Sequence, residues 1–380
     1  AVLFIKNGYK ASILTRIDID IAGANVLAAS RSAGKLLISA KDGSATRIVL
    51  IDAAGPHEEL ARINEHLNGI RPPKTQEVSY RLEDPSGRHH PRRVDVCLFL
   101  PKDFDSDRRY PLLIEVYPTG LSGSCRTLAD APKFGFAPED LWSSRGFIYV
   151  RPAIPLDLAA NPDDPLGNFG NLVDQTIDAL AKVSSIDPDR VAVFGFSQGG
   201  AAALVTAVQA HRPAAIISMN GWANYLSHYF GARGLMRYFH LDQNGGDNRW
   251  RYECQREGPS HICPFGFGVS AFGDPASYAY ASPVTRASEV TAPILLIHSD
   301  FDYFDMAQYD EMFGALYRAG KEARYVRYWG EGHGPSSPAN IRDLWDRFDR
   351  FLIDAGIIDF DTRSVIATAN EASMPAAKPQ

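Results

Sequence analysis

The serine best placed for chemistry is Ser197, in the run Gly195-Phe196-Ser197-Gln198-Gly199. The apolar segment Val191–Phe194 precedes this run, and the small-residue segment Gly200–Ala210, which has helical spacing, follows it. A strand, a tight turn and a helix in this order are typical of a nucleophile elbow, in which flanking glycines make room for a strained serine. The turn would also place the hydroxyl at a helix N-terminus, where backbone N–H groups stabilise a developing oxyanion. The pattern therefore predicts nucleophilic catalysis by Ser197.

A serine hydroxyl needs a histidine to take its proton and a carboxylate to orient that histidine. Behind an elbow of this kind the acid comes first and the histidine second, each after a later strand. His333 lies in the glycine-rich loop 330–334, just before the last expected helix, and is the predicted base. His298 is the competing candidate, although its place at the end of a strand also fits a packing role.

The carboxylate is expected in the loop after Ile297, which contains Asp300, Asp302 and Asp305. A residue in the middle of the loop can clear the strand edge and turn back towards His333, so Asp302 is the predicted acid. Asp300 is the competitor, and Asp305 is expected to cap the helix that begins near Met306. The three aspartates lack the spacing of a calcium loop, and neither a metal nor an organic cofactor is expected.

The elements that must hold these residues alternate between strands and helices over residues 77–357. Expected strands are Val78–Leu82, Val94–Leu100, Tyr110–Tyr117, Phe147–Val150, Val191–Phe194, Ala214–Met219, Pro293–Ile297 and Tyr325–Tyr328. Expected helices are Leu172–Val183, Gly200–Ala210, Met306–Ala319 and Ile341–Ile353. This alternation predicts an α/β domain whose mostly parallel central sheet is covered by helices on both faces. An insertion at about 231–273 interrupts the pattern, and residues 358–380 are expected to be a disordered tail.

Residues 1–55 follow a different rule, with short runs rich in Val, Ile and Leu separated by turn residues. The expected strands are Ala1–Ile5, Ala11–Ile19, Lys35–Ala40 and Thr46–Ile51, paired antiparallel. Four strands cannot close a barrel or cover both faces of a sheet. We therefore expect residues 1–55 to be the end of a larger all-β unit, joined to the α/β domain by a linker at 56–76.

Composition excludes several classes of protein. The 380 residues carry a net charge of −6, which gives no general attraction to nucleic acid or to a membrane surface. No apolar run reaches the ~18 residues that cross a bilayer. Four cysteines are too few for a disulfide framework. Cys254 and Cys263 are close enough in sequence to form a local bridge, and two free thiols are the alternative.

The motifs around Ser197, Asp302 and His333 resemble those of the prolyl oligopeptidase family of serine peptidases, over about Pro111 to Ile353. The resemblance implies an α/β-hydrolase fold, and it makes residues 1–55 similar to the last strands of the family's N-terminal β-propeller. It implies a peptide substrate and, as a partner, the missing N-terminal part of that propeller.

The same resemblance assigns further residues. Tyr117 matches the tyrosine that helps the backbone N–H of Gln198 to hold the oxyanion, although an aromatic residue at a strand end also fits packing on the sheet. The segment Trp222–Tyr229 looks like the family's pocket for the residue on the acyl side of the cut. Expected substrate-binding residues are Phe196, Trp222, Tyr225 and Tyr229, although core packing would also place two tyrosines on one helix face.

Two departures from the family pattern point to a subfamily. The loop after Tyr117 reads Pro-Thr-Gly-Leu-Ser-Gly-Ser-Cys, and a cysteine-bearing insert lengthens the interval from Ser197 to Asp302. The combination looks most like the bacterial lasso-peptide isopeptidases. A dipeptidyl- or acylaminoacyl-type exopeptidase, a carboxylic ester hydrolase and an inert peptide-binding scaffold are the alternatives. The compartment, bacterial cytoplasm or periplasm, stays open.

Overall fold

The computed structural model describes residues 2–7, 10–16, 24–30, 32–52, 57–118, 125, 135–161, 164–231 and 267–359. The chain divides into two compact units, Ala1–Pro72 and Pro73–Gln380. Most of the predicted insertion (232–266) and of the predicted disordered tail (360–380) lies outside the described residues, as do Cys254 and Cys263.

The first unit is built from antiparallel strands. A two-stranded sheet pairs β1 (Val2–Asn7) with β2 (Lys10–Arg16). A four-stranded sheet follows in the order β3 (Asn25–Ser30), β4 (Lys35–Asp42), β5 (Ala45–Asp52) and β6 (Glu58–Ile63), and the 3₁₀ helix η1 (Glu65–Gly69) comes after it.

Two strands of the first unit, β3 and β6, were not expected, and β6 and η1 occupy the predicted linker at 56–76. Every residue of β3 and β6 is exposed, so their sequences carry no alternating apolar pattern. Backbone pairing to β4 and β5 makes them strands instead. The buried cluster of the four-stranded sheet is small and consists of Leu36, Ile38, Val49 and Ile51. The edge strands of such a sheet carry unpaired backbone groups, which neighbouring polypeptide would have to cover.

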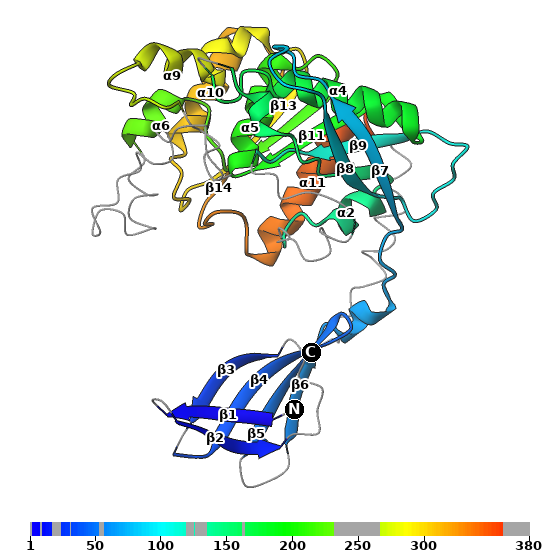
Figure 1. The fold of residues 1–380 in the computed structure, drawn as a ribbon, viewed down its shortest axis with the longest axis vertical. Coiled ribbons are helices and arrows are strands. Elements are labelled where there is room, and N and C mark those ends of the chain that lie inside the picture. Colours follow the sequence, from blue (N-terminus) through cyan, green and yellow to red (C-terminus); the bar gives the residue numbers. More distant parts are fainter. Residues whose placement is uncertain are drawn as a thin grey trace, which may run out of the picture. The chain divides into compact units, whose positions relative to one another are not determined.

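The second unit contains an eight-stranded sheet in the order β14-β13-β12-β11-β9-β10-β8-β7 (Figure 1). Its strands are β7 (Thr75–Leu82), β8 (Arg92–Phe99), β9 (Tyr110–Glu115), β10 (Ile148–Val150), β11 (Ile186–Phe196), β12 (Ala215–Met219), β13 (Ile294–Ser299) and β14 (Ala323–Tyr328). The hairpin β7-β8 is antiparallel, and β10 pairs antiparallel with β8; the other pairs are parallel. This is the predicted α/β-hydrolase fold.

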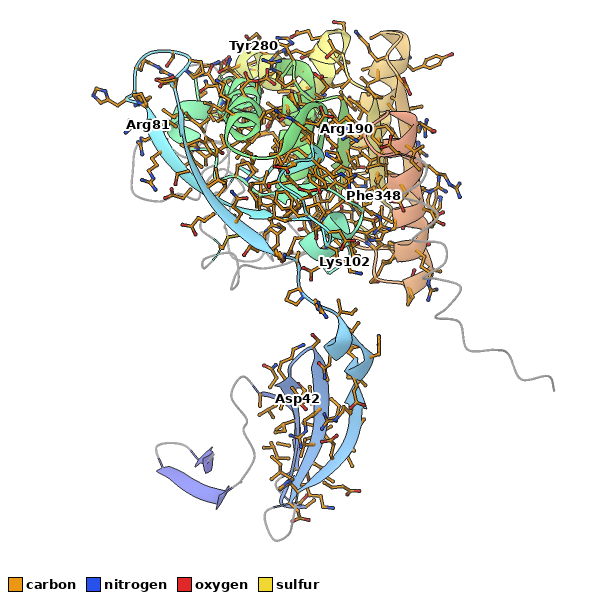
Figure 2. All side chains as sticks on the ribbon, turned by 90° about the vertical axis from the view of Figure 1, so that its right-hand side faces the viewer. Asp42, Arg81, Lys102, Arg190, Tyr280 and Phe348 are labelled. Carbon is orange, nitrogen blue, oxygen red and sulfur yellow. A yellow bond between two sulfur atoms is a disulfide. The ribbon has the colours of Figure 1, made fainter. Side chains whose placement is uncertain are left out.

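Helices cover both faces of this sheet. Its helices are α2 (Glu139–Ser144), α3 (Leu156–Ala159), α4 (Phe169–Val183), α5 (Gln198–Gln209), α6 (Tyr225–Gly231), α9 (Pro275–Ala281), η2 (Pro283–Glu289), α10 (Ala307–Arg318) and α11 (Pro338–Asp354). Alternate residues of each central strand point to opposite faces, as Leu112 and Leu113 do. Leu112 packs in the core that holds α4, α5 and α10, whereas Leu113 packs in the core that holds α2 and α11. Phe348 of α11, labelled in Figure 2, is fully buried in the second core.

One covalent feature of the second unit corrects the cysteine analysis. Cys97 of β8 and Cys125 form a disulfide, although neither was expected to be bridged. The two residues are 28 positions apart in sequence, and only the fold brings their Cα atoms to 4.6 Å. Within the described ranges, no helix combines the length and the apolar character needed to cross a bilayer.

Candidate active site

The elbow at Ser197 is held by backbone crowding. Ser197 lies between β11 and α5 with φ 62° and ψ −123°, a conformation that is strained for a residue with a side chain. A Cβ atom on Gly195 would lie 1.9 Å from the carbonyl oxygen of Gly199, and one on Gly199 would lie 2.3 Å from the carbonyl oxygen of Val116. Neither position therefore accepts a side chain unless the helix or the neighbouring strand moves.

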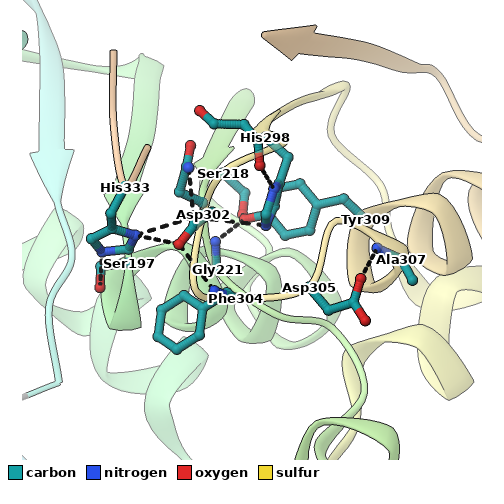
Figure 3. Close-up of polar contacts among 12 residues, drawn as sticks. Ser197, Ser218, Gly221, His298, Asp302, Phe304, Asp305, Ala307, Tyr309 and His333 are labelled. Carbon is teal, nitrogen blue, oxygen red and sulfur yellow. Dashed lines mark hydrogen bonds and ion pairs between the residues drawn. The ribbon is translucent and has the colours of Figure 1, made fainter. Parts of the chain in front are cut away.

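Ser197, His333 and Asp302 form one hydrogen-bonded chain (Figure 3). The Nε2 atom of His333 is 2.8 Å from the Ser197 Oγ atom. The Nδ1 atom of His333 is 2.9 Å and 3.1 Å from the two carboxylate oxygens of Asp302. A proton on Nδ1, facing the carboxylate, leaves the Nε2 lone pair free to accept the serine proton. The structure brings together the three residues predicted for this chemistry.

The competing residues have other partners. The Asp300 carboxylate accepts the backbone N–H of Gly330, and that of Asp305 accepts the N–H of Ala307, the first residue of α10, as expected of a helix cap. His298 is fully buried, and its Nδ1 atom lies 3.0 Å from the carbonyl oxygen of Ser299. Burial lowers the pKa of His298 despite the nearby Asp302 carboxylate, so the ring is neutral at neutral pH.

The Asp302 carboxylate is fully buried, and it accepts hydrogen bonds from two groups besides His333. Its Oδ1 atom accepts the backbone N–H of Phe304 at 3.0 Å, and its Oδ2 atom accepts the side-chain amide of Asn220 at 2.6 Å. Asn220, at the end of β12, was not identified from the sequence, because nothing in its local pattern relates it to a loop 82 residues away.

Aromatic rings enclose the imidazole of His333. The ring of Phe196 lies 4.6 Å from it, that of Tyr303 4.3 Å and that of Phe304 5.3 Å, measured between ring centroids. The His333 side chain keeps 18% of its surface exposed. The rings pack around the imidazole, and its Nε2 atom keeps its contact with the Ser197 Oγ atom. Tyr303 and Phe304 were not predicted.

The loop that carries His333 is fastened by a carboxylate, also not predicted. Glu331 is buried, and its two oxygens accept hydrogen bonds from the backbone and hydroxyl groups of Ser336 and Ser337 and from the amide of Asn340. Burial alone would raise the pKa of Glu331, but these hydrogen bonds outweigh it and lower the pKa to about 2. A Glu followed by two serines at a helix start is the signal that would have found this contact.

The residues expected to hold an oxyanion lie at the elbow. Gln198 is the first residue of α5, so its backbone N–H has no partner within the helix ladder. Tyr117 follows β9, and its ring passes 3.1 Å from the position that a Cβ atom on Gly199 would take. Both residues are therefore close to Ser197, and their role as oxyanion donors stays a prediction.

The residues expected to line a substrate pocket lie in an aromatic cluster. Trp222 and Tyr225 are each 1% exposed, whereas Tyr229 is partly buried against the ring of Tyr278. Trp222 contacts Phe304 at 4.9 Å between ring centroids, so the cluster adjoins the His333 loop. Packing explains these positions without a substrate, and the pocket role stays a prediction.

A separate cavity of about 280 Å³ lies between α6 and α10. Its lining comprises Ser227, His228, Gly231, Asp305, Ala307, Gln308 and Glu311. In the part of the chain that the structure describes, no three His, Cys, Asp or Glu side chains gather as metal ligands would.

Comparison with known proteins agrees with this geometry. Residues 260–355 match the prolyl oligopeptidase family, and residues 159–232 match the phospholipase/carboxylesterase family. A probable glutamyl endopeptidase, chloroplastic, from Oryza sativa subsp. japonica is 28% identical over 302 residues, covering 73% of this chain and 28% of the relative.

Two solved structures have a similar fold. An acylaminoacyl peptidase from Pyrococcus horikoshii superposes with a TM-score of 0.54 at 18% identity, over 86% of this chain and 48% of that one. The AtxE2 isopeptidase superposes with a TM-score of 0.53 at 20% identity, over 90% of this chain and 50% of that one. The chain thus spans about half of these two structures and less than a third of the rice protein.

These likenesses cover both units of the chain. The antiparallel strands of the first unit resemble propeller blades of the solved relatives. The family match falls on the segment that carries Asp302 and His333, and the fold around it is shared with solved peptidases of the same group. The chain is therefore similar to the prolyl oligopeptidase family over residues 260–355, and it shares its fold with solved peptidases.

Proposed function

We propose that this chain hydrolyses an amide bond in a peptide through Ser197, His333 and Asp302. The observation that carries the proposal is the 2.8 Å contact between the Ser197 Oγ atom and the His333 Nε2 atom, with Asp302 bound to the other side of the ring. Nucleophile and base are within hydrogen-bond reach, and a third group orients the base, as covalent catalysis requires.

The reaction has two halves. In the first, His333 takes the Ser197 proton while Oγ attacks the amide carbonyl, and the backbone N–H of Gln198 and the Tyr117 hydroxyl hold the resulting oxyanion. His333 then gives its proton to the leaving amine, which leaves an acyl group on Ser197. In the second half, His333 takes a proton from water, the hydroxide formed attacks the acyl carbon, and the serine regains its proton as the acid product departs.

Labelling with a fluorophosphonate probe tests this assignment, because the probe phosphonylates activated serines and releases fluoride. We expect the wild-type chain to be labelled once and Ser197→Ala not at all. Ser144→Ala removes an exposed hydroxyl that bonds only within α2 and serves as the matched control. Equal labelling of wild type and Ser197→Ala in an intact chain would overturn the proposal.

The first unit fits the end of a larger β-propeller. Its four-stranded sheet has exposed edge strands and a four-residue core, so it needs further strands to form a stable layer. The partner proposed for these strands is the N-terminal part of the same propeller. A pull-down tests the pairing: the chain should retain that part of the propeller. Charged substitutions at Val26 and Leu27, whose side chains are more than half exposed, should abolish the retention.

The substrate class proposed within the family is the isopeptide bond that closes a lasso-peptide ring. The likeness to the AtxE2 isopeptidase and the cysteine-bearing segments after Tyr117 and Gly231 support it. Incubation with a threaded lasso peptide and with a linear peptide of the same composition distinguishes the cases by mass spectrometry. Addition of one water to the lasso peptide alone is the expected result; cleavage of the linear peptide alone would favour a dipeptidyl or acylaminoacyl exopeptidase.

An ester hydrolase is the second candidate, favoured by the match of residues 159–232 to the phospholipase/carboxylesterase family. The same serine chemistry cleaves esters, whose leaving alcohol needs less help from the protonated histidine. Matched ester and amide substrates with one acyl group separate the candidates. Turnover of the ester without detectable turnover of any amide would favour the esterase.

A further inference from the structure

Asn220 hydrogen-bonds the acid of the proposed triad from a different element than His333 does. It directly follows β12, is fully buried, and its side-chain Nδ2 atom lies 2.6 Å from the Oδ2 atom of Asp302. The carboxylate cannot donate a hydrogen bond when ionised, so the amide is turned with its N–H towards Asp302. Oδ1 of Asp302 is held by the backbone of Phe304, so the two oxygens are fixed from different elements.

This contact persists although two features of Asn220 disfavour it. Its φ of 48° is in the left-handed region, which costs free energy for a residue other than glycine. Its Oδ1 atom is buried without a hydrogen-bond partner among the described residues, which adds a further free-energy cost to folding. The backbone is pinned as well, since the Asn220 N–H donates to the carbonyl oxygen of Ile297. Strain and an unsatisfied acceptor at a single residue are typical of a position kept for function.

We propose that Asn220 is a positioning residue that acts on His333 through Asp302; the inference rests on the proposed function of the triad. Its N–H stabilises the ionised carboxylate and holds the Oδ1–Oδ2 plane against the imidazole. Part of the carboxylate charge is thereby taken up by the amide. Without that donor, more of the charge acts on His333, the imidazole is protonated at higher pH, and less of it is available as a base.

The other titratable groups around Asp302 are few. His298 of β13 has its Nε2 atom 4.0 Å from the Oδ2 atom, and burial keeps that ring neutral. Tyr309 of α10 packs against His298 with ring centroids 5.0 Å apart. Asp305 lies on the same loop as Asp302, between β13 and α10. Burial raises the pKa of Tyr309, so it stays neutral too. His333 is therefore the titratable neighbour that is in direct hydrogen-bond contact with Asp302.

Two substitutions test the proposal. Asn220→Asp keeps the size and tolerates a positive φ, but it places a second carboxyl group against Asp302. Asn220→Gly relieves the backbone strain and removes the whole side chain, so that Asp302 loses the amide donor without gaining a charged neighbour. Asn224→Asp is the matched control, because it makes the same charge change at an amide that binds Glu311 instead.

The primary readout is the rate of fluorophosphonate labelling as a function of pH. We expect the acid limb of the profile to move upward by about one pH unit in Asn220→Asp, less in Asn220→Gly, and not at all in Asn224→Asp. The second readout is the low-field proton resonance of the His333–Asp302 hydrogen bond, which should move in both Asn220 variants. This resonance needs no turnover.

Two outcomes would overturn the inference: folded Asn220 variants with the wild-type acid limb, or a uniform rate loss at every pH with an unmoved limb and resonance. Thermal unfolding monitored by circular dichroism checks folding. If Asn220→Asp does not fold, Asn220→Gly decides. A wild-type chain that is not labelled would instead overturn the proposed function, and the resonance would still show whether Asn220 acts on Asp302.

Discussion

The nucleophile elbow and the histidine loop hold their side chains by different means. At the elbow, Gly195 and Gly199 are pressed against backbone carbonyl groups, and the strained conformation of Ser197 follows from that contact. In the histidine loop, a Cβ atom on Gly332 would meet nothing within 4 Å, and Glu331 fixes the loop through hydrogen bonds instead. Steric positioning does not depend on pH, whereas positioning by a carboxylate does.

The difference shows what each region tolerates. Backbone contacts at the elbow leave no room for substitution but need no particular charge. The histidine loop has space for a side chain at Gly332, and its geometry depends on the Glu331 carboxylate and on Asp300, which accepts the Gly330 N–H. The two regions should therefore respond differently to substitution.

Removal of the imidazole should have the largest effect on reaction rate. We expect His333→Ala to lower the rate of fluorophosphonate labelling by about four orders of magnitude, because His333 is the proposed base for the Ser197 proton. His298→Gln should lower the labelling rate far less, since His298 contacts the carbonyl oxygen of Ser299 and not the Ser197 hydroxyl. Equal losses of labelling rate in His333→Ala and His298→Gln would mean that His333 is not the specific base for Ser197.

A side chain at the elbow should have the next largest effect. In Gly195→Ala, the new Cβ atom must displace the Gly199 carbonyl, so we expect at least a hundredfold slower labelling and a loss of about 3 kcal/mol in the free energy of unfolding. Gly332→Ala, in open space, should leave both values within a few-fold and about 0.5 kcal/mol of wild type. Urea unfolding and labelling rates measure the contrast, and similar losses in both variants would contradict it.

Neutralising the carboxylate of the histidine loop should have a pH-dependent effect. The pKa of Glu331 is lowered from 4.5 to about 2 in the folded chain, so its contribution is complete above pH 4.5 and is lost as the pH falls towards 2. Glu331→Gln should therefore cost roughly 3 kcal/mol of unfolding free energy at pH 7 and slow labelling about tenfold. The gap between wild type and variant should close between pH 4.5 and 2. A gap that is constant in urea titrations across this range would refute the carboxylate mechanism.

The disulfide should have the smallest effect on rate. Cys125→Ser breaks the link to Cys97 and releases a 28-residue loop, which should cost about 2–4 kcal/mol of unfolding free energy and lower labelling only a few-fold. Thermal unfolding with and without reductant measures the difference, and wild type in reductant should match the variant. A labelling loss as large as that of Glu331→Gln would place the loop after Tyr117 in the catalytic geometry.

The local patterns that predicted the fold were those that involve neighbours in sequence. The expected strand Ala214–Met219 contains β12, because a continuous apolar run is typical of a strand buried on both faces. The expected helix Ile341–Ile353 lies within α11, because helical apolar spacing marks one buried face. The strand β6 escaped, since its exposed residues carry no such spacing and only pairing with β5 makes it a strand.

Sequence order and residue type sufficed to select Ser197, Asp302 and His333 as candidates, because the elbow turn and the strand ends that follow it are local signals. Folding alone settled what surrounds them. Asn220 and Asp302 are 82 residues apart, and Cys97 and Cys125 are separated by a strand and a loop. Hydrogen bonds and disulfides of this kind depend on distances that arise only when the sheet and its loops are assembled, so no pattern of neighbouring residues encodes them.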